Sequence, residues 1–153
     1  MQNLDDIDRR LLRLLQDVAT RSVPDLADAA GLSTAPCWRR IEKLEKAGVI
    51  RERRVMINKK ALGFEVQVFL RITLDKTQSN AFDAFIREAR EIPEVETIQT
   101  LLGRVDIRMD VIARDLEHYQ HIYKTRILEL PHIAEIEALM LVSELKNTEG
   151  LPI

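Results

Sequence analysis

A three-residue turn, Gly31-Leu32-Ser33, constrains the fold of this chain more than any other feature of its sequence. The segment before it opens with Ser22, a residue suited to the N-cap of a helix that carries an apolar side. Gly31 accepts the left-handed backbone that ends a helix, and Ser33 suits the N-cap of the next helix, expected over residues 34–47. A turn this short sets two helices at a steep angle, and the pattern predicts a helix-turn-helix.

The second of these helices has one apolar side and one basic side. Cys37, Ile41 and Leu44 recur at helical spacing and predict its buried stripe. The other residues face outward or flank that stripe, where a recognition helix would meet the major groove. The candidate DNA-binding residues are Ser22, Ser33, Thr34, Trp38, Arg39, Arg40 and Lys43.

Each candidate residue type suits a particular contact with DNA. Arg39 can reach a guanine edge with its fork of donors, whereas Arg40 and Lys43 suit phosphates. Ser33 and Thr34 stand at a helix N-terminus, where hydroxyls and main-chain N–H groups can meet a phosphate. Trp38 lies off the buried stripe; it either contacts a thymine methyl or sugar, or packs on a neighbouring part of the protein.

The formal charge of −2 is unevenly divided along the chain. Residues 1–60 carry thirteen Lys or Arg against nine Asp or Glu, whereas residues 61–153 carry ten against sixteen. Within residues 38–60 the count is nine to three. DNA, a polyanion, would therefore meet the N-terminal part of the chain. The alternative is an ordinary corner between two helices whose charged face is only solvated.

The pattern of apolar residues changes after Gly63. Alternating apolar residues predict strands over residues 66–74, 95–102, 106–112 and 133–145, with helices before the second and the fourth strand. The order β-α-β-β-α-β is typical of an antiparallel sheet with two helices on one face. Residues 49–57 predict a further short β element, a wing beside the helix-turn-helix. We therefore expect an α+β protein with domains at 1–60 and 61–153.

Catalytic and metal-binding patterns are weak. Cys37 lies on a predicted buried stripe with no histidine near it in the sequence, which favours a buried apolar role. His118 and His121 could share a metal, but no third ligand is evident. Asp106 and Asp110 alternate on one strand without a nucleophile or a phosphate-binding loop. We expect no enzyme activity, no catalytic residue, no metal and no cofactor.

No apolar run approaches the roughly 18 residues of a membrane span, and the acidic N-terminus lacks the apolar core of a signal peptide. The single cysteine cannot form an internal disulfide. These features predict a cytoplasmic protein that makes no membrane contact, and the predicted DNA binding would associate it with the nucleoid.

Taken together, these segments resemble the Lrp/AsnC family, the feast/famine regulators of bacteria and archaea. The resemblance is carried by residues 4–12, by Leu26-Ala27 with Gly31-Leu32-Ser33, by residues 36–50, and by the closing Lys146-Asn147-Thr148 and Leu151-Pro152. It covers essentially the whole chain. It implies a winged helix-turn-helix at 1–60, followed by a βαββαβ ferredoxin-like (αβ-plait) domain at 61–153 that senses a ligand and forms oligomers.

The resemblance also implies an assembly and an effector. Family members form dimers through the sheet, often assembled into octamers, and bind amino acids or related metabolites in clefts near the turn after the second strand. This implies that the effector-binding residues here are Leu102, Gly103, Arg104 and Asp106. From the residues alone, Gly103 makes either a hairpin turn or a close backbone approach to a ligand.

One position departs from the family pattern. The family often has glycine, an acidic residue, an aromatic or similar residue and aspartate in this turn, whereas this chain has Gly103-Arg104-Val105-Asp106. The arginine implies an unusual or more acidic effector, or none. We expect a sequence-specific transcriptional regulator that binds double-stranded, palindrome-like DNA. The alternative function is an architectural, chromatin-like protein with little sequence preference.

Overall fold

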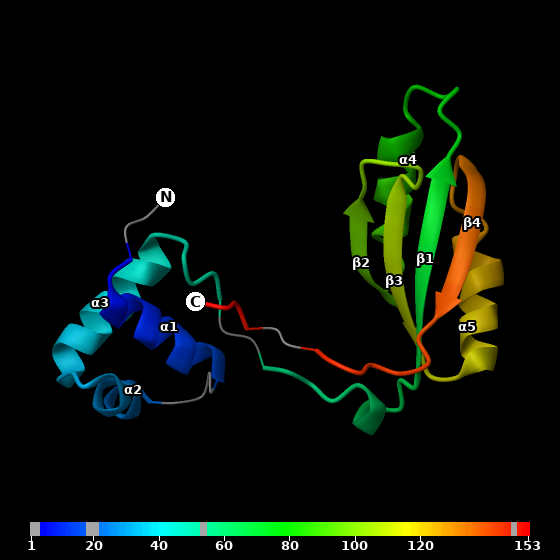
Figure 1. Cartoon of the computed structure of the whole chain (residues 1–153). Coiled ribbons are helices and arrows are strands. Elements are labelled where there is room, and N and C mark those ends of the chain that lie inside the picture. The colour runs from blue at the N-terminus through cyan, green and yellow to red at the C-terminus, as the bar shows by residue number, and fades with distance from the viewer. Residues whose placement is uncertain (1–3, 18–21, 53–54, 148–149) are drawn as a thin grey trace. The chain divides into compact units, whose positions relative to one another are not determined.

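The chain forms two compact units, Met1–Met56 together with Leu145–Ile153, and Ile57–Glu144 (Figure 1). This computed structural model describes residues 4–17, 22–52, 55–147 and 150–153. None of the helices within these ranges is both long enough and apolar enough to cross a membrane.

The first unit is built on three helices, α1 (Asp6–Asp17), α2 (Val23–Ala30) and α3 (Thr34–Lys46). The Ser22 side chain accepts a hydrogen bond from the Asp25 main chain, while the Asp25 carboxylate accepts one from the Ser22 main chain, a capping box that starts α2. Gly31 ends α2 with φ +70°, a conformation that costs glycine little. The predicted helix-turn-helix is therefore confirmed.

The core of this unit joins all three helices. It consists of Leu11 from α1, Leu26, Ala27 and Ala30 from α2, and Cys37 and Ile41 from α3. The prediction that Cys37 lies on a buried stripe is confirmed, since its side chain is fully buried. The tight turn brings α2 and α3 close enough for small and branched apolar residues to interlock.

The described part of the predicted wing contains no strand. Residues 49–52 and 55–57 contain no strand, and Val55, Met56 and Ile57 are largely exposed. Apolar and charged residues alternate loosely in this segment, but a β element also needs a second strand to receive its main-chain hydrogen bonds. The described part of the first unit offers no such strand, and residues 53 and 54 of the predicted wing lie outside the described residues.

The C-terminal residues group with the first unit rather than with the second. The Gln16 side chain of α1 donates to the main-chain carbonyl of Leu151 at 3.3 Å and accepts from the Leu151 N–H. Arg13 donates to the Ile153 carbonyl at 3.3 Å. The two compact units divide after Met56 and again at Leu145. The domains at 1–60 and 61–153 stay a prediction. Contacts between residues about 135 positions apart leave no local pattern in the sequence.

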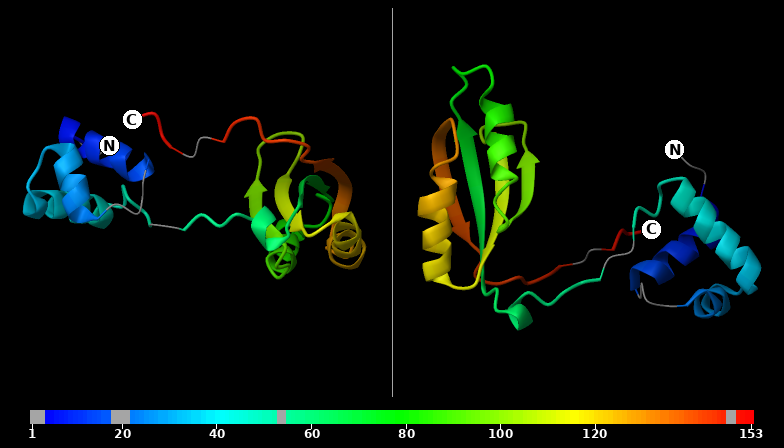
Figure 2. Two further views of the ribbon diagram at one scale, coloured as in Figure 1. Left: turned by 90° about the horizontal axis from the view of Figure 1, so that it is seen from below. Right: turned by 180° about the vertical axis from the view of Figure 1, so that it is seen from behind.

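The second unit has the predicted β-α-β-β-α-β order. Its elements are β1 (Val66–Leu74), α4 (Ala81–Ala89), β2 (Val95–Thr100), β3 (Ile107–Ala113), α5 (Leu116–Ile122) with the π-helical turn η2 (Tyr123–Ile127), and β4 (Ile133–Met140). The four strands form one antiparallel sheet in the order β2-β3-β1-β4. Both helices cover the same face of this sheet (Figure 2).

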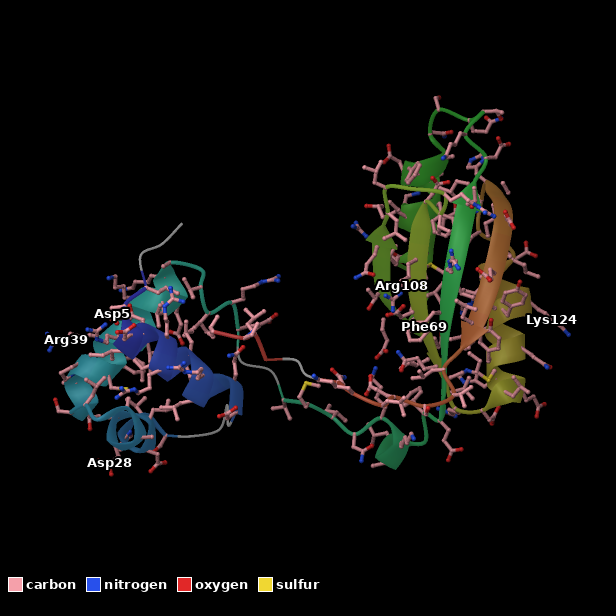
Figure 3. The ribbon with its side chains drawn as sticks, viewed as in Figure 1. Asp5, Asp28, Arg39, Phe69, Arg108 and Lys124 are labelled. Atoms are coloured by element: carbon pink, nitrogen blue, oxygen red, sulfur yellow. The ribbon has the colours of Figure 1, made fainter. Side chains whose placement is uncertain are left out.

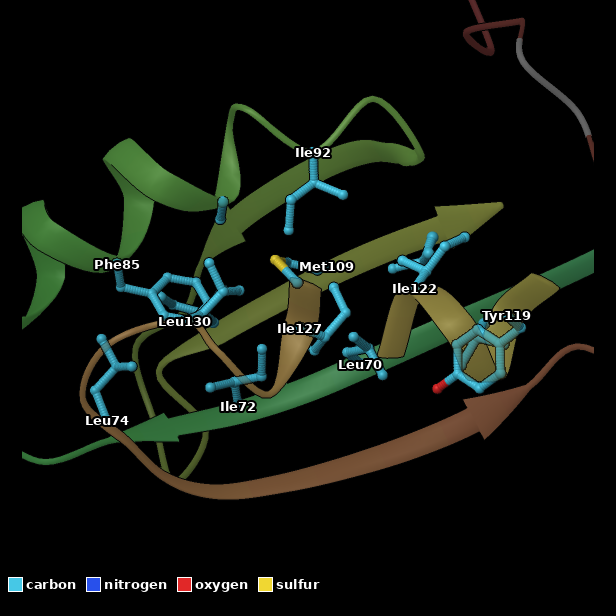
Figure 4. Close-up of a cluster of buried hydrophobic side chains, with 14 of the residues drawn as sticks. Leu70, Ile72, Leu74, Phe85, Ile92, Met109, Tyr119, Ile122, Ile127 and Leu130 are labelled. Carbon is cyan, nitrogen blue, oxygen red and sulfur yellow. The ribbon is translucent and has the colours of Figure 1, made fainter. Parts of the chain in front are cut away.

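The core of the second unit lies between the sheet and its two helices (Figure 4). Leu70, Ile72 and Met109 point from the central strands toward Phe85 of α4 and Ile122 of α5, and all five are buried. Alternate residues of β1 and β3 point to the other face, which no helix covers.

The last strand is shorter than predicted. It ends at Met140, five residues before the expected end at Leu145. Its ladder with β1 runs from Ile133 opposite Leu74 to Met140 opposite Val68. The apolar residues after Met140 continue the alternation, but Val142 and Leu145 are almost fully exposed because the chain leaves the sheet there.

Candidate DNA-binding and effector sites

The outer face of α3 presents most of the predicted DNA-binding residues to solvent. Thr34, Trp38, Arg39 and Lys43 are exposed, and Trp38 keeps 51% of its surface accessible, so it is not a core residue. Figure 3 shows Arg39 extending outward from α3. Beside it lies a shallow hollow lined by Asp5, Pro36, Arg39, Arg40 and Lys43. Arg39, predicted to contact a base, and Lys43, predicted to contact a phosphate, thus lie beside the same hollow on the outer face of α3.

The two predicted serines have different surroundings. The Ser22 hydroxyl hydrogen-bonds the Asp25 carboxylate within the capping box, so it stabilises the start of α2. Ser33 precedes α3 with an extended backbone and is exposed, but its side chain makes no capping hydrogen bond. The first N–H groups of α3 therefore point outward without a side-chain acceptor from Ser33, as an approaching phosphate would require.

Arg40 occupies a position that sequence reasoning did not anticipate. Its Nη1 atom donates to Asp5 Oδ2 at 2.6 Å and to Asp8 Oδ1 at 2.7 Å. This pairing raises the pKa of the guanidinium further, through the hydrogen bonds to Asp5 and then to Asp8. The pKa of Asp5 is lowered, chiefly by the hydrogen bond from the Asp8 main chain and next by Arg40. No sequence pattern indicated this pairing, because the partners lie 32 and 35 residues away.

The candidate effector turn connects β2 to β3. Gly103 has φ +156°, a backbone conformation that residues with a Cβ rarely adopt. Among the described residues other than its two chain neighbours, a Cβ added to Gly103 would have no atom within 4 Å, so the space beside this main chain is open. Leu102 is completely exposed and Arg104 is also exposed. Three of the four predicted effector residues are thus accessible at the tip of one turn.

Asp106, the fourth predicted effector residue, is buried, with 4% of its surface exposed. Its Oδ2 atom accepts from the Leu74 N–H at 3.0 Å, and its Oδ1 atom pairs with Lys76 Nζ at 2.9 Å. The Lys76 hydrogen bond is the main cause that lowers the pKa of this carboxyl, against the effect of burial. Both oxygens are therefore engaged within the chain. Sequence reasoning missed Lys76, which lies on the loop after β1 and has no motif to mark it.

The helix-free face of the sheet is a third candidate surface. The Arg108 guanidinium lies 4.8 Å from the centroid of the Phe69 ring, and Figure 3 labels both residues on this face. Arg108 also pairs with Asp110 at 3.1 Å on its own strand, and Arg71 pairs with Glu137 of β4 at 3.0 Å. Phe69 and Leu139 lie opposite one another in the ladder between β1 and β4 and leave apolar surface accessible.

The residues that the sequence offered as nucleophile or metal-ligand candidates lie in these surroundings. Within the part of the chain that the structure describes, no set of three or more His, Cys, Asp or Glu side chains is placed to hold a metal ion. Burial raises the pKa of the Cys37 thiol, which disfavours the reactive thiolate. Asp110 is paired with Arg108, as described above.

The chain thus combines a helix-turn-helix that has a basic outer face, an arrangement suited to the major groove of DNA, with a four-stranded α+β unit. The Lrp/AsnC ligand binding domain matches residues 67–151, and the AsnC-type helix-turn-helix domain matches residues 4–45. The chain belongs to the Lrp/AsnC family of transcriptional regulators.

Known transcriptional regulators are similar to this chain over nearly its whole length. The DNA-binding transcriptional activator DecR of Escherichia coli is 31% identical over 98% of this chain and 99% of its own length. A transcriptional regulator of Neisseria meningitidis, solved in complex with L-methionine, superposes with a TM-score of 0.92 at 26% identity and covers 98% of this chain and 97% of its own. An AsnC family regulator of Agrobacterium tumefaciens gives a TM-score of 0.88 at 35% identity, with 97% of each chain covered.

Proposed function

We propose that this regulator reads a specific DNA sequence with the outer face of α3. The observation that carries this proposal is the exposure of Arg39 and Lys43 along one basic helix of a helix-turn-helix. Arg39 donates to a guanine edge in the major groove, and Lys43 neutralises a phosphate. Ser33 and Thr34 present hydroxyl and N–H groups to the adjoining backbone. Trp38 contacts a thymine methyl or a sugar. In the cell the protein resides on the nucleoid.

Two copies of the chain together bind a palindrome-like site. The helix-free sheet face supports this assembly, because Phe69 and Leu139 leave apolar surface there and the paired charges around them are compatible with a twofold interface. Two linked recognition helices gain affinity from their high effective concentration. Dimers assemble further toward an octamer.

The effector is a small molecule that carries a carboxylate, an amino acid or a related metabolite. The open space beside the Gly103 main chain and the exposed guanidinium of Arg104 support this choice, since both suit an anion. A solved family relative was crystallised with L-methionine. Asp106 holds the turn in place and does not contact the effector, because its two carboxylate oxygens already bind Leu74 and Lys76.

The decisive experiment selects genomic fragments with the purified full chain and measures the affinity for a selected fragment and for random DNA at several salt concentrations. A specific regulator binds the selected fragment roughly a thousandfold or more tightly at physiological salt. An affinity that is alike for both DNAs would favour the architectural alternative, and failure to retain any DNA would overturn the proposal.

Two variants assign the contacts. Arg39→Ala is expected to cost about 1–3 kcal/mol on the selected site and to relax base preference at one position. Lys43→Ala is expected to weaken binding to all sequences alike and to reduce the salt slope by about 1. Glu42→Gln, on the same helix, controls for a change of charge. Wild-type affinity and salt dependence in both variants would remove this face of α3 from the interface.

A further inference from the structure

We propose that Arg40 and the carboxylates of Asp5 and Asp8 form a positioning device that sets the orientation of α3, and that Arg40 is not a ligand of DNA phosphate. This inference rests on the proposed DNA-binding function and refines it. In this proposal Arg40 contacts two carboxylates of its own chain instead of a DNA phosphate. Asp5 and Asp8 then favour DNA binding although they carry the same charge sign as DNA.

Asp5 and Asp8 are held together by hydrogen bonds that do not involve Arg40. The Asp8 N–H donates to Asp5 Oδ1 at 2.8 Å, and the Asp5 N–H donates to Asp8 Oδ2 at 3.4 Å. This reciprocal pattern is that of a capping box at the start of α1. Each carboxylate therefore keeps its second oxygen directed at Arg40, and the Nη1 atom of Arg40 donates to both of these oxygens.

Burial makes this arrangement hard to exchange for a phosphate contact. The Asp8 side chain is only 8% exposed, and that of Arg40 is 31% exposed. If Arg40 turned to a phosphate, Asp8 would lose the cation that the structure pairs with it while it stayed in a poorly solvated site. The carboxylate of Asp5 would in addition stand beside the DNA backbone. Both changes cost free energy, so the guanidinium stays with its carboxylates when DNA binds.

The place of Arg40 on α3 explains what the device controls. Arg39 and Lys43 stand one and three residues away from Arg40 along the helix. These three residues and Asp5 line the same shallow hollow. Holding Arg40 against α1 fixes the rotation of α3 about its own axis. The same rotation determines how Arg39 and Lys43 are presented to the groove.

The test compares Asp8→Asn with Glu42→Gln in the full chain, since both remove one negative charge from the first unit. A phosphate-binding Arg40 would be released by Asp8→Asn, and the variant would bind DNA more tightly. The positioning role gives the opposite sign, a loss of roughly tenfold on the selected fragment at fixed salt. Glu42→Gln, which leaves Arg40 untouched, is expected to bind as tightly as wild type or slightly more tightly.

Salt dependence gives a second readout, which a loss of stability alone would not move. Arg40→Gln is expected to weaken binding roughly tenfold with an unchanged salt slope, whereas Lys43→Gln lowers the slope by about 1. The double variant Asp8→Asn with Arg40→Gln should bind no more weakly than the weaker single variant, because both substitutions break one device.

Folding is followed in every variant by the fluorescence of Trp38, the single tryptophan of the chain, which reports on α3 itself. Affinities are measured at a temperature where this fluorescence is that of the folded protein. If Arg40→Gln is not folded at any usable temperature, Arg40→Lys takes its place. The Arg40→Lys variant should bind DNA more weakly than wild type with the wild-type salt slope. Tighter binding by Asp8→Asn, or a flattened slope in Arg40→Gln, overturns the inference. Wild-type protein that selects no DNA refutes the proposed function instead.

Discussion

The carboxylate of Asp106 accepts a hydrogen bond from the main-chain N–H of Leu74 at 3.0 Å, between two buried residues that lie 32 positions apart. This bond ties the first residue after the β2–β3 turn to the end of β1. The Asp106 N–H in turn donates to the Ile72 carbonyl at 3.0 Å. The turn that carries Gly103 and Arg104 is thereby held against the central strand β1.

Asp106→Ala is expected to lower the free energy of unfolding by about 1–3 kcal/mol, because it leaves the buried Leu74 N–H without its acceptor. The folded-state pKa of Asp106 lies below its usual value of 3.8, so its contribution is complete above about pH 4 and is lost as the pH falls further. Urea unfolding between pH 3 and pH 7 measures both effects. Asp83→Ala, an exposed acid on α4, is the control, and an equal loss in that variant would contradict this account.

Arg104→Ala is expected to weaken effector binding at least roughly tenfold, since a carboxylate loses a charge-assisted donor. Gly103→Val is expected to abolish binding, because its side chain forces the main chain away from φ +156° and fills the open space beside it. Calorimetry with a panel of amino acids and dicarboxylates measures both. Arg87→Ala on α4 should bind as wild type does. A ligand whose affinity ignores Arg104 and Gly103 would locate the sensing site elsewhere.

Phe69→Glu is expected to shift the full chain from dimer or larger assembly toward monomer at micromolar concentration. It places a carboxylate on the helix-free sheet face, directly across the ladder from Asp110, where a second copy would cover it. Light scattering measures the mass of the particle. Leu116→Glu, a substitution of an exposed leucine on α5, should leave the assembly intact. If Phe69→Glu stays fully assembled, the interface lies on another surface.

Tyr119→Phe is expected to stabilise the second unit by about 1 kcal/mol at neutral pH, because the Tyr119 hydroxyl is buried without a hydrogen-bond partner. Burial raises the pKa of this hydroxyl from 10 to about 12. Wild-type stability should therefore fall from about pH 10 toward pH 12, where only the unfolded chain ionises freely, and the variant should lose that part of the decline. Thermal unfolding across this range, with Tyr123→Phe as the comparison, checks the assignment. A variant that is less stable than wild type at neutral pH would mean that the hydroxyl has a partner in solution.

The helix-turn-helix of the first unit and the order of strands and helices in the second could be predicted, because both depend on residues that are close in the sequence. Ser22 and Gly31 act within four residues of their own position, through a capping box and a left-handed backbone, so their consequences are visible in the sequence. The alternation of β1 likewise identifies its buried face before any partner strand is known. The strands predicted at residues 49–57 and after Met140 are absent from the described residues 49–52 and 55–57 and from the chain after Met140. Whether a segment joins a sheet depends on a neighbouring strand, which a local pattern does not reveal.

The sequence by itself determined which helix carries the basic face, where the helix-turn-helix bends, and the succession of strands and helices in the second unit. Only the tertiary structure decided which partners the charged residues have within the chain. Arg40 was expected at a phosphate and is paired with Asp5 and Asp8; Asp106 was expected at an effector and is engaged by Leu74 and Lys76. The physical reason is that an ionic side chain is stabilised by whichever opposite charge or donor the fold brings within about 3 Å. That proximity arises from chain segments about 30 residues apart, whose meeting no local pattern records.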